Sequence, residues 1–261
     1  MGNVELLDKT RKINKILHNG SSGRVAFNDI CSVFCDILSS NVIVLDRAGR
    51  VLGACSLPEI EELRELIRNE KDSYVDAGFN ERLLNVLSTK ENVNLETLGF
   101  AYGTGGYKAL ITPVDIAGER LGTVFTYKTG SDYGIDDIIL CEYGAAVIGL
   151  EMMRDKGEES ALRERNAQAA RDAAGALSDS EGRALLLLLE NLPDGEGTLV
   201  TSRIADEAGM TRSVIVNTVK KLDGAGIIEA RSSGMKGTRI RVVNNAIYEE
   251  AENLKRGKIP G

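Results

Sequence analysis

Apolar positions recur at two different spacings along the chain, and the spacing predicts where helices and strands lie. Recurrence every three or four residues predicts helices, whereas short continuous apolar runs bounded by turn residues predict strands. Helices are predicted over residues 4–17, 26–38, 58–69 and, without a proline, 136–177. Strands are predicted over 41–45, 50–55, 108–114 and 119–128. The stretch 73–107 predicts two short helical pieces and a glycine-rich loop.

The order of these elements predicts a sensor domain of the GAF or PAS type. Such a domain is an antiparallel sheet with helices on one side and a small-molecule pocket under loops on the other. The hairpin signals Asp46-Arg47-Ala48-Gly49 and Ala117-Gly118 join consecutive strands. Hydrophobic spacing alone does not distinguish GAF from PAS.

The long predicted helix changes character along its length. Its first half is strongly apolar, and its second half, 158–174, is charged and rich in alanine. We expect the first half to pack on the sensor and the second half to bridge to another domain, with a dimer contact along it. Ser178-Asp179-Ser180-Glu181 predicts a capping box that starts a fresh helix. The chain is therefore expected to be α+β, with a GAF-like domain over 1–155, a linker helix over 136–177 and, from the pattern and charge of its C-terminal part, a winged helix-turn-helix DNA-binding domain over 178–261.

The stretch 200–243 predicts a winged helix-turn-helix. A short helix is expected to end at Gly209, where a turn needs a residue tolerant of positive φ, and Thr211 is expected to cap a second helix. Val214, Ile215, Val219 and Leu222 form one buried stripe of that helix. Strands over 227–231 and 238–243 then flank a glycine-containing loop, which predicts the wing.

Charge supports a nucleic-acid interface in this region. Residues 198–245 carry eight Lys/Arg against four Asp/Glu, while the whole chain has a net charge of −7. A basic patch on an acidic protein favours a delimited duplex-DNA face. The alternative is a helical protein-interaction module with a solvated charged face. The candidate DNA-binding residues are Ser202, Arg203, Thr211, Arg212, Ser213, Asn217, Lys220, Lys221, Ser232, Lys236 and Arg239.

Candidate chemistry for catalysis or metal binding is sparse. His18 is the only histidine, which argues against Ser-His, Cys-His and most transition-metal arrangements. The four cysteines, at 31, 35, 55 and 141, lie in apolar surroundings and are expected to be small buried hydrophobes. No run of eighteen apolar residues occurs, and the N-terminus is charged and amphipathic. We therefore expect a cytoplasmic protein that is not an enzyme, has no resident cofactor or metal, and has no membrane partner.

Several motifs resemble the CodY family of nutrient-sensing transcriptional repressors. They span the chain, and the most specific lie in the predicted recognition helix and wing. They are Lys9-Thr10-Arg11-Lys12-Ile13-Asn14, Gly118-Glu119-Arg120-Leu121-Gly122-Thr123, Thr211-Arg212-Ser213-Val214-Ile215-Val216-Asn217 and Gly234-Met235-Lys236-Gly237-Thr238. The resemblance implies a homodimer whose GAF sensor binds branched-chain amino acids, with GTP as a second effector in many members. Effector binding would raise affinity for an operator and repress genes used when nutrients are scarce.

The resemblance also implies an amino-acid site. Arg64 matches the family's carboxylate-binding arginine, and a bidentate guanidinium suits that role. Val75 and Phe79 match the apolar walls, and the stretch Phe100, Ala101 and Tyr102 matches the loop whose backbone would hold the amino group. The alternative for Arg64 is a surface arginine paired with a neighbouring glutamate. The glycine-rich loop departs from the family pattern, being shorter and lacking its Phe-Pro pair, so the preferred amino acid stays open.

For GTP, the candidate residues are Arg47 and Arg50 on the first hairpin, with Glu151 and Lys156 on the long helix. Asp46 adds negative charge where phosphates would approach, and exposed turn charges are the alternative interpretation. Two functions stay open on the sequence. One is an effector-activated repressor, and the other is a regulator of the same architecture that has lost the amino-acid response or senses another small molecule.

Overall fold

The computed structural model describes residues 3–16, 24–61, 63, 74–100, 106–232 and 237–257. The chain divides into two compact units, Met1–Gly157 and Glu158–Gly261. In the part of the chain that is described, no helix combines the length and apolarity needed to cross a membrane.

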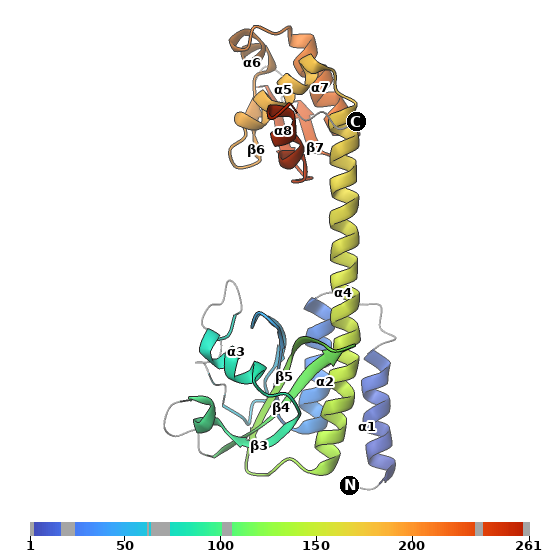
Figure 1. The fold of residues 1–261 in the computed structure, drawn as a ribbon, viewed down its shortest axis with the longest axis vertical. Helices are drawn as coiled ribbons and strands as arrows, with labels where there is room; N and C mark the ends of the chain where they lie inside the picture. The colour runs from blue at the N-terminus through green and yellow to red at the C-terminus, as the bar shows by residue number, and fades with distance from the viewer. Residues whose placement is uncertain are drawn as a thin grey trace. The chain divides into compact units, whose positions relative to one another are not determined.

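The first unit is built around a five-stranded antiparallel sheet (Figure 1). Its strands are β1 (Asn41–Asp46), β2 (Val51–Cys55), β3 (Lys90–Asn94), β4 (Tyr107–Ile116) and β5 (Glu119–Thr129), in the spatial order β2-β1-β5-β4-β3. Its helices are α1 (Asn3–Ile16), α2 (Arg24–Leu38), α3 (Ala77–Leu84), the short 3-10 helix η2 (Leu95–Leu98) and the start of α4 (Ile135–Gly175). This is the predicted α+β arrangement with an antiparallel sensor sheet.

The sheet separates two hydrophobic cores, because alternate residues of a strand point to opposite faces. On one face, residues such as Val44 and Val124 pack against α1, α2 and α4. On the other face, residues such as Leu45, Phe125 and Tyr127 pack against α3 and η2. In Figure 1, α1, α2 and α4 accordingly lie on one side of the strands and α3 on the other.

The second unit is a small helical domain with a three-stranded antiparallel sheet. The end of α4 contributes Ala170, Ala173 and Ala174 to its core. The other elements are α5 (Asp179–Glu190), β6 (Glu196–Leu199), α6 (Thr201–Glu207), α7 (Arg212–Gly224), β7 (Ile228–Ser232), β8 (Thr238–Val242) and α8 (Ile247–Lys255). The strand order is β6-β8-β7. The capping box expected at Ser178 and Glu181 is present and starts α5.

Most predicted elements lie where the spacing placed them, but three elements were not predicted and one predicted helix is wrong in its described part. The structure adds β3, β6 and α8, which the sequence did not predict. The predicted helix over 58–69 is wrong in its described part, because Pro58 and Glu59 lie in a turn and Leu63 is in irregular chain. The rest of that stretch lies outside the described residues. Cys31, Cys35 and Cys141 are buried free thiols as expected, whereas Cys55 is partly exposed.

Candidate nucleic-acid interface and effector site

The helix-turn-helix presents one buried and one exposed face. Gly209 ends the turn after α6 with φ 61°, a conformation that favours glycine. Ile215, Val219 and Leu222 are buried in the core of the second unit. Thr211 occupies the N-cap position of α7, as expected, although its side chain makes no capping hydrogen bond. The burial pattern fixes which side of α7 faces solvent.

The exposed face of α7 carries Arg212, Ser213, Asn217 and Lys220. Residues 213, 217 and 220 follow the helical spacing of a single stripe. These side chains offer amide, hydroxyl and cationic groups, which bond base edges and phosphates. The structure therefore gathers four of the candidate DNA-binding residues on one solvent-facing surface.

The remaining candidates lie on α6, at the end of α7 and in the wing. Ser202 and Arg203 are exposed on α6, where Arg203 pairs with Glu207 at 2.8 Å. Ser232 ends β7 and Arg239 lies on β8, both exposed. Lys236 lies outside the described residues.

Lys221 differs from its neighbour Lys220 because its ammonium is engaged within the protein. It lies 2.7 Å from a carboxylate oxygen of Glu181 and donates to the carbonyl oxygen of Ala176 at 3.2 Å. The hydrogen bond from Lys221 is the main cause that holds the pKa of Glu181 below its usual value. Lys221 thus ties α7 to the start of α5.

On the α3 side of the sensor sheet, aromatic side chains form a continuous cluster in which Phe79 and Phe125 are buried and Phe100 is partly buried. The rings of Phe79 and Phe100 meet edge to face at 5.1 Å, and those of Phe79 and Phe125 at 5.3 Å. Val75 is buried in the same core. Three of the candidate effector residues, Val75, Phe79 and Phe100, therefore share one apolar region. Arg64, Ala101 and Tyr102 lie outside the described residues.

A hydrogen-bond network holds the chain that leads to position 64 against this cluster. The backbone N–H of Leu63 donates to the hydroxyl of Tyr127 at 3.3 Å, and the side-chain amide of Asn41 donates to the same hydroxyl at 3.1 Å. Asn41 also accepts from the backbone N–H of Leu57 at 2.7 Å. The sequence did not single out Asn41 or Tyr127, because their partners lie far away along the chain.

The first hairpin, which carries Arg47 and Arg50, is joined to the segment that carries Val75 and Phe79. The backbone N–H of Val75 donates to the carbonyl of Gly49 at 3.0 Å. Asn80 donates to the carbonyl of Arg47 at 3.1 Å. Gly49 has φ 85°, and a Cβ there would lie 3.0 Å from the Asn80 side chain, so this junction favours glycine. The two candidate effector regions are therefore in direct contact.

Three of the four candidate GTP residues, Arg50, Glu151 and Lys156, form ion pairs within the protein. Arg50 pairs with Asp46 at 3.2 Å, and Lys156 pairs with Glu119 at 3.3 Å. Glu151 is buried and pairs with Arg154. At Gly122 on β5, a Cβ would collide with the carbonyl of Leu45 and press on Met152 of α4, so the end of β1 and the helix segment carrying Glu151 meet there.

Arg120, from the motif Gly118-Glu119-Arg120-Leu121-Gly122-Thr123, has a structural role at the start of β5. Its guanidinium donates to the carbonyl oxygens of Gly122, Val86 and Leu83 and to the hydroxyl of Thr123. Burial lowers its pKa, opposed by nearby Asp115. The residues before it form the β4–β5 turn, which confirms the hairpin predicted at Ala117-Gly118. Among the described residues, no group of three or more His, Cys, Asp or Glu side chains is placed to hold a metal ion.

Comparison with known proteins gives two family matches. The CodY GAF-like domain matches residues 5–174, and the CodY helix-turn-helix domain matches residues 195–255. A global transcriptional regulator CodY from Caldanaerobacter subterraneus is 39% identical over 253 residues, covering 97% of this chain and 100% of the relative. The protein of the same description from Geobacillus thermodenitrificans is 38% identical, covering 97% and 99%.

Among solved structures, the cofactor-binding GAF domain of the nutrient sensor CodY from Clostridium difficile is similar to part of this chain. It is 33% identical, covers 58% of this chain and 99% of its own, and superposes with a TM-score of 0.46.

Proposed function

Because the chain belongs to the CodY family of global transcriptional regulators, we propose that it is an effector-activated repressor that binds operator DNA through α7 and the wing. A branched-chain amino acid in the sensor unit would raise its affinity for the operator. The family is one of transcriptional regulators, and we propose no catalytic activity. The protein would act in the cytoplasm, on genes used when nutrients are limiting.

The exposed stripe of α7 carries the DNA-binding proposal. Arg212, Ser213 and Asn217 lie in the N-terminal half of α7, which a helix-turn-helix places in the major groove. Arginine pairs with guanine and asparagine with adenine through bidentate hydrogen bonds. We therefore assign base contacts to Arg212 and Asn217 and a phosphate contact to Lys220. Thr211, Ser202, Arg203, Ser232, Lys236 and Arg239 would position the duplex around them.

Titration of a cognate and a scrambled duplex with alanine variants tests this assignment. Arg212→Ala and Asn217→Ala should each cost about 1–3 kcal/mol on the cognate duplex only. Lys220→Ala should weaken both duplexes alike and flatten the salt dependence. Lys255→Ala, which removes one positive charge from α8, is the matched control. Unchanged affinity in all the α7 variants would refute the assignment.

A homodimer follows from the geometry of operator recognition, since one winged helix covers a single half-site. The outward side of α4 in the first unit supports this proposal. Ile135, Ile139, Leu150 and Met153 are all large apolar residues exposed there, with Ile135 76% exposed. With Ala146, also exposed, they approximate the spacing of a helix–helix seam.

Sedimentation at micromolar concentration tests the homodimer. The wild-type protein should sediment as a dimer, and a Leu150→Lys, Met153→Lys variant should sediment as a monomer. Leu87→Lys, at a residue 85% exposed on the loop after α3, should leave the dimer intact. A wild-type monomer with and without DNA would contradict the proposal.

The aromatic core under α3 supports the amino-acid site. Val75, Phe79 and Phe100 offer an apolar surface for a branched side chain. We assign the ligand carboxylate to Arg64 and the amino group to the backbone of Ala101 and Tyr102, following the family motif. Desolvated carboxylates require such a charge-assisted partner.

Calorimetric titration with isoleucine, valine and leucine, one at a time, tests this site. Arg64→Ala should abolish detectable binding, because a buried charge left unpaired costs roughly 2–5 kcal/mol. Arg11→Ala, which removes an exposed charge from α1, is the control. Absence of binding by the wild-type protein would favour the alternative, a regulator of this architecture that senses another small molecule.

GTP is proposed as a second effector, held by Arg47, Arg50, Glu151 and Lys156. The meeting of the first hairpin with α4 near Gly122 favours this site. The ion pair between Arg50 and Asp46 opposes it, because a phosphate would have to displace Asp46. Titration of the wild-type protein and of Asp46→Asn with GTP tests whether the Arg50–Asp46 ion pair prevents GTP from binding. No binding to either protein would leave the amino acid as the sole proposed effector.

A further inference from the structure

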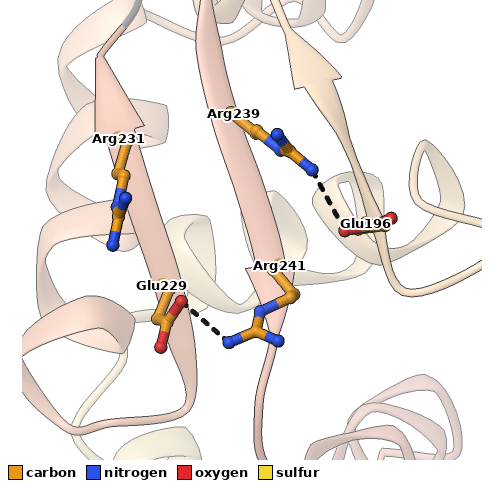
Figure 2. A pocket seen from close by; sticks show the side chains of 5 residues that line it. All are labelled: Glu196, Glu229, Arg231, Arg239 and Arg241. Carbon is orange, nitrogen blue, oxygen red and sulfur yellow. Dashed lines mark hydrogen bonds and ion pairs between the residues drawn. The ribbon is translucent and has the colours of Figure 1, made fainter.

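The solvent-facing side of the wing sheet carries five charged side chains that share one depression. Glu196, Glu229, Arg231, Arg239 and Arg241 line it, and Figure 2 shows them projecting from the same side of the three strands. We call this surface the arginine face. Its volume is about 250 Å³, below the roughly 300–1,000 Å³ of small-molecule pockets, and all five of its lining residues are charged. It suits charged groups on the surface of a macromolecule.

The strand register arranges these side chains in two rows. Arg231 of β7 lies directly opposite Arg239 of β8, one pair away from Ser232 and Thr238, where the strands enter the wing loop. Arg241 lies between Glu229 on one side and Glu196 on the other. Both charged side chains of the row next to the wing are therefore cationic, and the row behind it carries both signs of charge.

The three arginines differ in how far they are neutralised. Arg241 is held by Glu229 at 3.0 Å. Arg239 lies 3.6 Å from Glu196, beyond hydrogen-bond distance, and both side chains are mostly exposed. Arg231 has no ion pair within the described ranges, and Figure 2 draws no interaction from it. Arg231 and Arg239 are thus the two guanidinium groups with capacity for another anion.

Two like charges directly opposite on a sheet destabilise it, and an anion between them relieves the repulsion. A phosphate oxygen pair accepts bidentate hydrogen bonds from guanidinium groups. An exposed ion pair such as Arg239–Glu196 contributes little stability, so a phosphate displaces the carboxylate at small cost.

We propose that Arg231 and Arg239 clamp a backbone phosphate of duplex DNA beside the wing, and that Glu196 competes with this phosphate for Arg239. The inference rests on the proposed function, because DNA is chosen as occupant from the helix-turn-helix that shares this unit. Glu196 then weakens binding to every duplex equally. Because this competition does not depend on DNA sequence, the choice between DNA sites rests on the base contacts made by α7.

The test measures affinity for an operator and for a scrambled duplex over a range of salt concentrations, using the full-length chain. Arg231→Ala and Arg239→Ala should each weaken both duplexes roughly tenfold, as loss of a charge-assisted hydrogen bond does. Each should also reduce the salt slope by up to about 0.9, the value for one phosphate contact. Glu196→Gln should strengthen both about two- to fivefold, the range of an exposed ion pair.

Two further variants keep the result interpretable. Arg231→Lys, Arg239→Lys retains both charges and the fold but lacks the forked geometry, and it should lose part of the affinity while keeping the salt slope. Lys255→Ala controls for net charge. If Arg212→Ala weakens operator binding while the arginine-face variants do not, the clamp is wrong and the proposed function stands. If Glu196→Gln leaves both affinities unchanged, the competition is wrong. If no variant of either set changes binding, the proposed function fails as well.

Discussion

The two units of the chain place their candidate functional groups in opposite environments. In the winged-helix unit, Arg212, Asn217 and Lys220 are exposed on one regular helix. In the sensor unit, Val75 and Phe79 are buried within an aromatic core formed across distant strands and loops. A DNA surface needs accessible charge on a rigid element, whereas a site for a small apolar ligand needs desolvation. We therefore expect mutations on the exposed face of α7 to change DNA binding without changing stability. Mutations in the aromatic core of the sensor unit should change ligand binding and stability together.

The largest expected effect is at Phe79. Phe79→Ala should lower the free energy of unfolding of the sensor unit by about 3–5 kcal/mol, because it removes edge-to-face contacts with Phe100 and Phe125 and leaves a cavity. Hydrogen exchange should show faster opening of β5 and α3 but not of α7. The control, Leu87→Ala, should change stability by less than about 0.5 kcal/mol. Equal loss of protection in both units would break the comparison.

Alkaline pH should also act on the sensor unit, because all four cysteines lie there. Burial raises the pKa of Cys31 and of Cys141 from 9.0 to about 12. The unfolded chain loses these protons first, so stability is unaffected below about pH 9 and falls by about 1.4 kcal/mol per pH unit per thiol above it. Urea unfolding at several pH values should show a shallower decline for Cys31→Ala than for the wild-type protein. Identical declines would contradict the buried-thiol account.

The smallest expected effect distinguishes two neighbouring lysines of α7, Lys220 and Lys221. Lys221→Ala should destabilise the winged-helix unit by about 1 kcal/mol, because it removes the hydrogen bonds to Glu181 and Ala176. Since the pKa of Glu181 is lowered, this contribution is present at neutral pH and is lost as pH falls through that lowered pKa. Lys220→Ala should leave stability unchanged and weaken duplex binding. The reverse outcome, with Lys221 controlling affinity and Lys220 stability, would exchange their roles.

Hydrophobic periodicity predicted those helices and strands whose own sequence carries a clear apolar pattern. The stripe of Ile215, Val219 and Leu222 predicted the orientation of α7, and Thr211 predicted its start. In contrast, β3 reads Lys-Glu-Asn-Val-Asn, which carries no strand pattern, and it forms because β4 offers a paired edge. β6 is only four residues long and likewise depends on pairing with β8.

The candidate sites show the same division. The charged stripe of α7 could be predicted because its members lie within three turns of one helix. The fixed position of Lys221 depends on Glu181, forty residues earlier. The two-row pattern of the arginine face was missed, although Arg239 and Arg241, two residues apart on a strand, signal a shared face. Their acidic partners came from other strands, and sequence spacing does not report such contacts.

The central claim is that a branched-chain amino acid in the sensor unit increases operator affinity. The most direct measurement is operator affinity of the wild-type protein with and without millimolar isoleucine, alongside Arg64→Ala. Binding linkage predicts tighter operator binding with isoleucine in the wild-type protein and unchanged basal affinity without response in Arg64→Ala. Identical operator affinity of the wild-type protein with and without isoleucine, valine or leucine would contradict the claim.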